Sequence, residues 1–202
     1  VVSVDTYVEG VHFLNFNSPN LVIKKIIRSS ISDFFCKGVE PKFIFIGASG
    51  NNYSFSKKNL SLISKSIKEE LKKFNIKLSG GDTTKSKQTI FTIITLGYSK
   101  SIVFRNNCKN GDDIYVTGNL GDSYLGLQIL KRKVSLNQKA KKYFVKKYYL
   151  PELPNKITSN LLKFANSSID ISDGLFADLL KLINETKLFF KIDLTKIPIS
   201  SY

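Results

Sequence analysis

Hydrophobic and polar positions repeat with two different periods along the chain, and the changes of period mark the predicted elements. β-Forming residues in partial alternation predict a strand over 1–8, and the apolar run at 42–49 predicts a short buried strand. Apolar residues that follow Pro19 predict a helix, which we expect Gly38 to cap. Apolar residues spaced by three and four positions predict an amphipathic helix over about 57–74.

Two more strands are predicted before a boundary in the chain. Residues 75–84 are interpreted as a strand that ends in a glycine turn, and residues 89–99 as the next strand. Asn, Gly and charged residues gather near 100–112, so we expect a domain boundary there.

The pattern of strands and helices continues beyond that boundary. It predicts a strand at 114–118 that turns into a helix, a strand or turn at 167–172, and a helix over 173–186. Strands that alternate with helices favour an α/β protein of the α+β type. We expect two domains, 1–110 and 111–202.

Composition narrows the class of protein. The longest apolar runs are a few residues, which is too short to cross a bilayer. The two cysteines, Cys36 and Cys108, lie far apart without a CxxC motif, so we expect reduced thiols in the cytoplasm. Both ends of the sequence read as cut within a longer protein, so we expect a fragment truncated at both ends.

The net charge of +15 makes nucleic acid a candidate partner. However, 28 of the 31 basic residues are Lys and only three are Arg, whereas base and phosphate recognition favours the bidentate Arg fork. A general Lys, Asn and Ile bias explains the charge more simply. We therefore expect neither a nucleic acid nor a membrane as partner, and a basic nucleic-acid-binding module remains the weaker alternative.

The few acidic residues are placed informatively. Several aspartates follow strands, glycines or hydroxyl residues: Asp5, Asp33, Asp82, Asp170 and Asp173. Carboxylates in such places are typical ligands of Mg²⁺, which also binds substrate phosphates. Such a set is suited to ATP and to phosphoryl transfer.

Each signal also has a structural interpretation. Asp82 fits a β-turn and Asp173 fits a helix cap, while His12, the only histidine, fits a structural role. The Gly118–Asp122 stretch fits a phosphate-binding turn and a capped helix start equally well. The case for a site rests on these signals occurring together in this order.

Five stretches, "DTYVEGVHF", "ISDFFCKG", "SGGDTT", "GDDIYVTGNLGDSYLGL" and "DISDGL", together resemble the thiamine-monophosphate kinase family. That family belongs to the aminoimidazole ribonucleotide synthetase-like superfamily of ATP-dependent enzymes. The resemblance implies a two-domain fold, a homodimer, and transfer of the ATP γ-phosphate to thiamine monophosphate with Mg²⁺, giving thiamine diphosphate. It also implies that ATP and Mg²⁺ lie between the two domains.

The resemblance also implies roles for single residues, matched motif by motif. Magnesium ligands are implied at Asp5, Asp33, Asp82, Asp170 and Asp173, with Ser3 as a substitute hydroxyl. ATP contacts are implied at Gly81, Asp82, Arg105 and Ser172. His12 is implied to contact the phosphate of the substrate. No side chain is expected to act as a nucleophile or general base, because the accepting phosphate oxygen is already anionic.

The chain departs from the family pattern at two places. Val4 stands where the family usually has Thr, and bulky Phe34 and Phe35 stand where small residues are usual. The family's upstream Gly-Asp-Asp segment and its C-terminal part are absent from these residues, so we expect this fragment alone to be inactive. Selenophosphate synthetase-like and hydrogenase-maturation-like enzymes of the same superfamily are the nearest alternatives.

Overall fold

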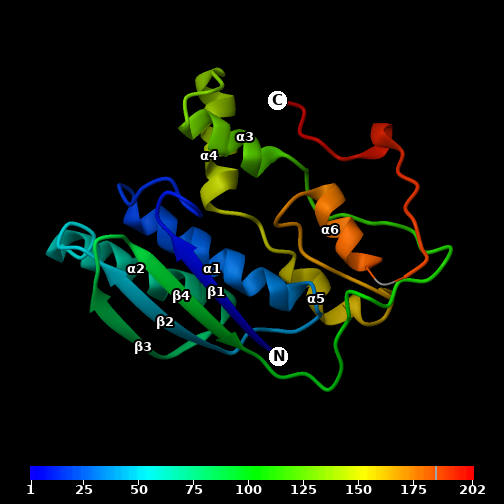
Figure 1. The fold of residues 1–202 in the computed structure, drawn as a ribbon, viewed down its shortest axis with the longest axis horizontal. Helices are drawn as coiled ribbons and strands as arrows, with labels where there is room; N and C mark the ends of the chain where they lie inside the picture. The colour runs from blue at the N-terminus through cyan, green and yellow to red at the C-terminus, as the bar shows by residue number, and fades with distance from the viewer. Residues whose placement is uncertain (185) are drawn as a thin grey trace. The chain divides into compact units, whose positions relative to one another are not determined.

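The chain folds into two compact units in the computed structural model shown in Figure 1. The structure describes residues 1–184 and 186–202. The first unit comprises residues 1–34 and 39–99, and the second comprises residues 35–38 and 100–202. The two units are described separately below.

The first unit is built on a four-stranded mixed sheet with the order β1-β4-β2-β3. The strands are β1 (Val2–Val8), β2 (Phe43–Gly50), β3 (Lys77–Lys85) and β4 (Ile90–Leu96). β4 pairs antiparallel with both β1 and β2, whereas β2 and β3 are parallel. The first and third strands of the chain therefore lie at opposite edges of the sheet.

Two helices, α1 (Pro19–Phe35) and α2 (Lys57–Phe74), cover one face of this sheet (Figure 1). Alternate strand positions, including Ile44, Phe91 and Ile93, are buried on that face. The Tyr7 hydroxyl lies 3.0 Å from the Ser30 hydroxyl of α1, which fixes β1 beneath that helix. Burial of these apolar side chains supplies the main driving force for this unit.

The opposite face of the sheet carries apolar side chains that remain exposed. On β1, Val2 and Val4 are 62% and 61% exposed. The next outward residue, Thr6, hydrogen-bonds through its hydroxyl to the hydroxyl of Thr92 on β4 at 3.0 Å. This face is a candidate contact surface, because apolar side chains clustered on an exposed sheet are unfavourable in water.

Predictions for this unit were confirmed except in one place. The strands at 1–8, 42–49 and 89–99 and the two helices are present. Gly38 follows α1 with φ +73°, and its N–H donates to the Phe35 carbonyl, as a helix cap requires. The predicted glycine turn is wrong, because β3 runs through Gly80-Gly81 and continues to Lys85.

The bulky pair at the end of α1 lies in the interior. Phe34 and Phe35 are 0% and 5% exposed. A Cβ atom added to Gly97 would lie 2.9 Å from the Phe34 ring, so the small residue on the neighbouring segment makes room for the large one. The family departure at Phe34 is thus accommodated inside the first unit.

The second unit is helical. It contains α3 (Asp122–Leu130), α4 (Gln138–Tyr149), α5 (Asn155–Leu161), α6 (Leu175–Leu182) and a short 3-10 helix, η1 (Leu194–Lys196). Gly126 of α3 lies against the backbone of Phe144 on α4, where a Cβ atom would meet the Phe144 carbonyl oxygen. Ile129, Ala140 and Phe144 form the core between these two helices.

The predicted strand at 114–118 is wrong, since these residues are extended or irregular. A β-forming run becomes a strand only when another strand pairs with it, and the described residues of the second unit contain no strand. The segment 167–172 likewise forms no strand, and the helix predicted at 173–186 is shorter, with α6 at Leu175–Leu182. Residue 185 of that prediction lies outside the described residues.

Within the described part of the chain, every helix is too short or too polar to cross a bilayer.

Candidate functional site

Three of the predicted magnesium ligands meet in the first unit. Strand alternation directs Ser3 and Asp5 of β1 to the same face of the sheet. The Ser3 hydroxyl lies 2.8 Å from Oδ2 of Asp33, in the last turn of α1, and 3.3 Å from Oδ2 of Asp5. Since a hydroxyl has one hydrogen, it can donate to only one of the two carboxylates at a time.

Strand alternation also explains the departure at position 4. Val4 belongs to the opposite face of β1 from Ser3 and Asp5, and it is largely exposed. A Thr side chain at position 4 would therefore point away from the Asp5 carboxylate. Ser3 supplies the hydroxyl on the carboxylate side.

His12 lies just after β1, in a loop that fixes its tautomer. The Val8 backbone N–H donates to Nδ1 of His12 at 3.0 Å, so Nδ1 is the acceptor and Nε2 carries the hydrogen in the neutral ring. The ring packs edge-on against Tyr7 at a centroid distance of 5.9 Å. The residue is exposed, so an Nε2–H donor is presented at the surface.

Glu9 holds the same loop rather than taking part in chemistry. Its Oε1 accepts the Phe16 backbone N–H at 2.9 Å, and its backbone carbonyl accepts Nε2 of Gln88, also at 2.9 Å. Gly10 has φ +83°, a conformation that favours glycine. The position of His12 thus depends on local hydrogen bonds at both ends of the loop.

Gly81 and Asp82 lie on β3, at the edge of the sheet opposite to β1. A Cβ atom on Gly81 would come 2.2 Å from the Ile46 carbonyl oxygen, so only glycine lets the backbones of β2 and β3 approach so closely. Asp82 is exposed, and its Oδ1 accepts the Thr83 backbone N–H at 2.8 Å.

The sheet keeps Asp82 away from Asp5. The strand order places two strands between β1 and β3. Neighbouring strands are about 4.8 Å apart, so three strand spacings separate the two aspartates by about 14 Å. Within one copy of the chain, these two carboxylates cannot bind the same ion.

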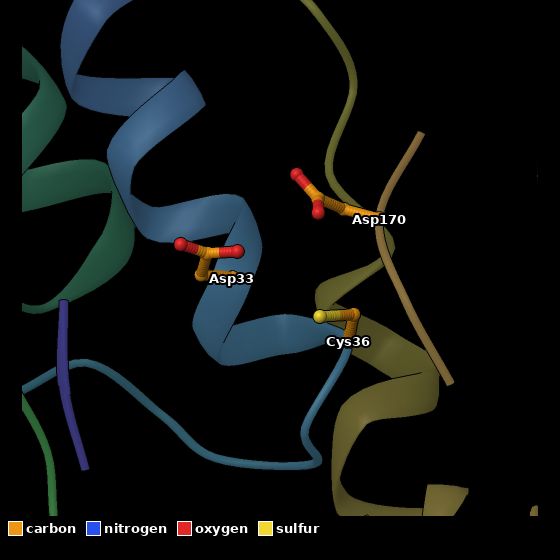
Figure 2. Close-up of side chains that lie close together, drawn as sticks. All are labelled: Asp33, Cys36 and Asp170. Carbon is orange, nitrogen blue, oxygen red and sulfur yellow. The ribbon is translucent and has the colours of Figure 1, made fainter. Parts of the chain in front are cut away.

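Asp170 belongs to the second unit, on the segment that precedes α6. Figure 2 shows its side chain with those of Cys36 and Asp33. In the second unit, a carboxylate oxygen of Asp170 and Sγ of Cys36 lie within 4.8 Å of each other. A thiol is a soft ligand that Mg²⁺ does not favour, so Cys36 does not extend the predicted magnesium set.

Ser172 and Asp173 lie in a loop that Asp178 of α6 organises. The backbone N–H groups of Ser172, Asp173 and Gly174 all donate to Oδ2 of Asp178, at 2.8, 2.9 and 3.1 Å. Lys181 Nζ donates to Asp173 at 2.6 Å and to Asp178 at 2.8 Å. The N-cap of α6 is Gly174 without a side-chain capping bond, so the interpretation of Asp173 as a helix cap is wrong.

These contacts shift the ionisation of the residues involved. Burial disfavours the Asp178 carboxylate, but the hydrogen bonds from Lys181 and from the loop backbone outweigh it and hold the pKa of Asp178 below its ordinary value. Hydrogen bonds to Asp173 and Asp178 raise the pKa of Lys181. Asp178 and Lys181 of α6 therefore form an ion pair that both pKa shifts favour.

Arg105 lies in the irregular segment after residue 100 and is exposed. Its segment runs beside the chain that leads to Asp170: the Ser168 N–H donates to the Phe104 carbonyl, and the Asn107 N–H donates to the Ser167 hydroxyl at 2.9 Å. The second unit thus places Arg105 on a strip of backbone adjacent to the 170–174 loop.

The side chains in the first unit fit a hard divalent cation. Ser3, Asp5 and Asp33 offer only oxygen atoms, two of the groups are carboxylates, and all three residues are half-buried. Mg²⁺ prefers such oxygen ligands. We therefore regard Ser3, Asp5 and Asp33 as the core of the candidate site.

Asp178 and Lys181 were not predicted from the sequence. The available signal was an aspartate among the apolar residues of "DGLFADLLKL", on a helix whose neighbours at Leu179 and Leu182 predict burial. A buried acidic residue requires a partner. Here that partner is the loop backbone together with Lys181.

Sequence comparisons match this chain to known proteins. The family described as AIR synthase related protein, N-terminal domain, matches residues 1–98. The thiamine-monophosphate kinase of Buchnera aphidicola subsp. Acyrthosiphon pisum is 38% identical over 98% of this chain and 62% of its own length. The chain therefore spans less than two thirds of the length of this relative.

Solved structures show the same likeness. The thiamine monophosphate kinase from Aquifex aeolicus matches with a TM-score of 0.83 and 27% identity, over 90% of this chain and 63% of that one. AaThiL complexed with AMPPCP and TMP matches with a TM-score of 0.84 and 28% identity, over 90% and 58% of the two chains.

Proposed function

This chain belongs to the thiamine-monophosphate kinase family, and we propose from that premise that the full-length protein phosphorylates thiamine monophosphate with ATP, giving thiamine diphosphate and ADP. Support comes from a likeness that extends over nearly the whole chain to the Buchnera kinase. It also comes from the related complex with AMPPCP and TMP. The proposal concerns the longer protein, because the chain spans 62% of that kinase.

The observation that carries this proposal is the convergence of Ser3, Asp5 and Asp33 around one hydroxyl. These residues would hold Mg²⁺ through oxygen atoms alone. When bound, Mg²⁺ would neutralise negative charge on the ATP phosphates during transfer. Asp170 and Asp173 of the second unit are proposed as further ligands. Asp82 of β3 is proposed as a ligand of a different Mg²⁺ ion, because the strand order keeps it away from Asp5.

In the proposed reaction, an oxygen of the thiamine monophosphate phosphate bonds to the γ-phosphorus of ATP. The bond between that phosphorus and the bridging oxygen breaks, and its electron pair leaves on ADP. The attacking oxygen is already anionic, so the protein needs no strong general base. Its task is to bring two anions together in line.

His12 is proposed to contact the phosphate of thiamine monophosphate. Because Nδ1 accepts the Val8 N–H, the hydrogen on Nε2 is available to a phosphate oxygen. For ATP, the proposed contacts are Gly81, Asp82, Arg105 and Ser172. Backbone N–H groups, a hydroxyl and a guanidinium are all suitable donors to phosphate.

We also propose that the protein is a homodimer. The exposed sheet face described above carries Val2 and Val4, with Thr6 and Thr92 beside them. Outward Phe45 of β2 extends this face to β3, since a Cβ atom on Gly80 would lie 3.1 Å from its ring. A second copy that packs its own sheet face here would remove these apolar groups from water.

An assay of the full-length protein tests the proposed reaction. We expect thiamine diphosphate to form from ATP and thiamine monophosphate in the presence of Mg²⁺, and turnover to stop in excess EDTA. Asp5→Asn should raise the half-saturating Mg²⁺ concentration on the order of tenfold or more, because it removes one carboxylate from the metal. His12→Ala should raise the KM for thiamine monophosphate more than the KM for ATP.

Asp193→Asn is the matched control, because Asp193 is an exposed carboxylate that caps η1 and accepts hydrogen bonds from Thr195. It should leave the Mg²⁺ requirement unchanged. Turnover that persists without any divalent cation would refute the metal assignment. A wild-type protein that forms no thiamine diphosphate under any of these conditions would refute the proposed activity.

A further inference from the structure

The chain buries one carboxylate that the proposed reaction does not use. Asp178 of α6 is 1% exposed, although the helix around it is apolar. A buried carboxylate is costly unless hydrogen bonds and an opposite charge compensate it. Asp178 obtains both, and each of its oxygens has a different partner.

One oxygen of Asp178 is bound to the backbone of the preceding loop. Oδ2 accepts the N–H groups of Ser172, Asp173 and Gly174 at 2.8, 2.9 and 3.1 Å. Ordinary capping would satisfy N–H groups of the first helical turn, whereas these groups precede the first residue of α6, Leu175. The carboxylate therefore fixes the course of the loop more than the end of the helix.

The other oxygen of Asp178 is connected through Lys181 to the exposed side chain of Asp173. Oδ1 accepts Lys181 Nζ at 2.8 Å, and the same ammonium donates to Oδ2 of Asp173 at 2.6 Å. The Asp173 side chain is 65% exposed, whereas that of Asp178 is 1% exposed. Lys181 thus connects a buried carboxylate to an exposed one, and Asp173 is held through both its backbone and its side chain.

We propose that Asp178 is a positioning residue for the 170–174 loop, acting on Ser172 and Gly174 through the backbone and on Asp173 through Lys181. The inference rests on the proposed function in one respect: it takes the loop as a contact for nucleotide and metal. Residues that orient the ligands of a metal site commonly affect affinity or activity by about 10-fold to 100-fold when they are replaced.

The test uses the full-length protein with Asp178→Ala, Asp178→Asn and Lys181→Met. Leu179→Ala is the matched control, because Leu179 is also buried in the same helix but donates or accepts none of the side-chain hydrogen bonds to the loop. Hydrogen exchange of the amides of residues 172–174 is measured first, since this readout needs no activity. KM values for ATP and for thiamine monophosphate are measured second.

Asp178→Ala should accelerate exchange of these amides by about tenfold or more, since it removes their shared acceptor. It should raise the KM for ATP by about tenfold and leave the KM for thiamine monophosphate nearly unchanged. Asp178→Asn keeps an acceptor oxygen but turns an amide N–H₂ toward Lys181. It should therefore keep the amide protection and, like Lys181→Met, raise the Mg²⁺ requirement.

The proposal is overturned if Asp178→Ala changes both KM values equally, or if it behaves like Leu179→Ala and lowers stability alone. Unchanged exchange at 172–174 also overturns it. If Asp178→Ala does not fold, Asp178→Asn and Lys181→Met decide instead, and an unchanged Mg²⁺ requirement in both variants overturns the proposal. An inactive wild type would count against the proposed function, while the exchange measurement would still decide the role of Asp178.

Discussion

A half-buried lysine on α1 makes the free energy of unfolding depend on pH. Burial lowers the pKa of Lys25 from 10.5 to about 8. Below pH 8 the lysine is charged in both the folded and the unfolded chain, and the cost of burying that charge is fully present. Between pH 8 and about 10.4 the unfolded chain binds more protons, so the free energy of unfolding rises with pH.

We therefore expect urea unfolding to show a stability increase between pH 7.5 and pH 9.5 that belongs to Lys25. The full effect approaches about 3 kcal/mol, since each pKa unit corresponds to about 1.4 kcal/mol. Lys25→Met should remove this rise. Lys58→Met, at an exposed lysine of α2, should leave it in place, and an equal slope in wild type and Lys25→Met would contradict the assignment.

At the level of elements, a buried ion pair connects α1 to α2. Arg28 Nε lies 2.7 Å from Oε2 of Glu70 and Arg28 Nη2 lies 2.9 Å from Oε1. The two residues are 7% and 2% exposed. Removal of one partner leaves a buried charge uncompensated, which costs more than the pair itself contributes.

Arg28→Met should lower the free energy of unfolding by about 3–5 kcal/mol, as measured by chemical denaturation. The double variant Arg28→Met/Glu70→Leu should recover most of that loss, because no unpaired charge remains. The exposed pair between Lys24 and Glu69 joins the same two helices and is the control: Lys24→Met should cost far less. If Arg28→Met and the double variant lower the free energy of unfolding equally, the loss comes from packing and not from an unpaired charge.

At the level of the whole molecule, the uncovered sheet face predicts self-association. We expect the full-length protein to sediment as a dimer and the variant Val2→Lys/Val4→Lys to sediment as a monomer with an unchanged circular dichroism spectrum. Charged side chains on this face would have to lose water in the interface, which is unfavourable.

Leu60→Lys is the control for that measurement, because Leu60 is also an exposed apolar residue but lies on α2. It should leave the dimer intact. A monomeric wild type, or a Val2→Lys/Val4→Lys variant that remains dimeric, would exclude this face as the interface.

The hydrophobic pattern predicted most elements of the first unit, because each of these elements follows the periodicity expected of a helix or a strand. Helix α2 agrees with its period of apolar residues and even with its bounds, Lys57–Phe74. The wrong predictions concern segments whose structure depends on whether a second strand pairs with them. Gly80-Gly81 continues as strand because β2 pairs with it, and 114–118 is not a strand because no strand pairs with it among the described residues of its unit.

For the candidate site, too, the sequence determined some features and the fold determined others. Motifs in the sequence carried the resemblance to the family, and that resemblance made Ser3, Asp5, Asp33 and His12 candidate site residues. The strand order decided which carboxylates lie close together. Asp5 and Asp82 are far apart because β1 and β3 lie at opposite edges of the sheet. The role of Asp178 also required the fold, because its partners are backbone N–H groups whose directions no residue letter specifies.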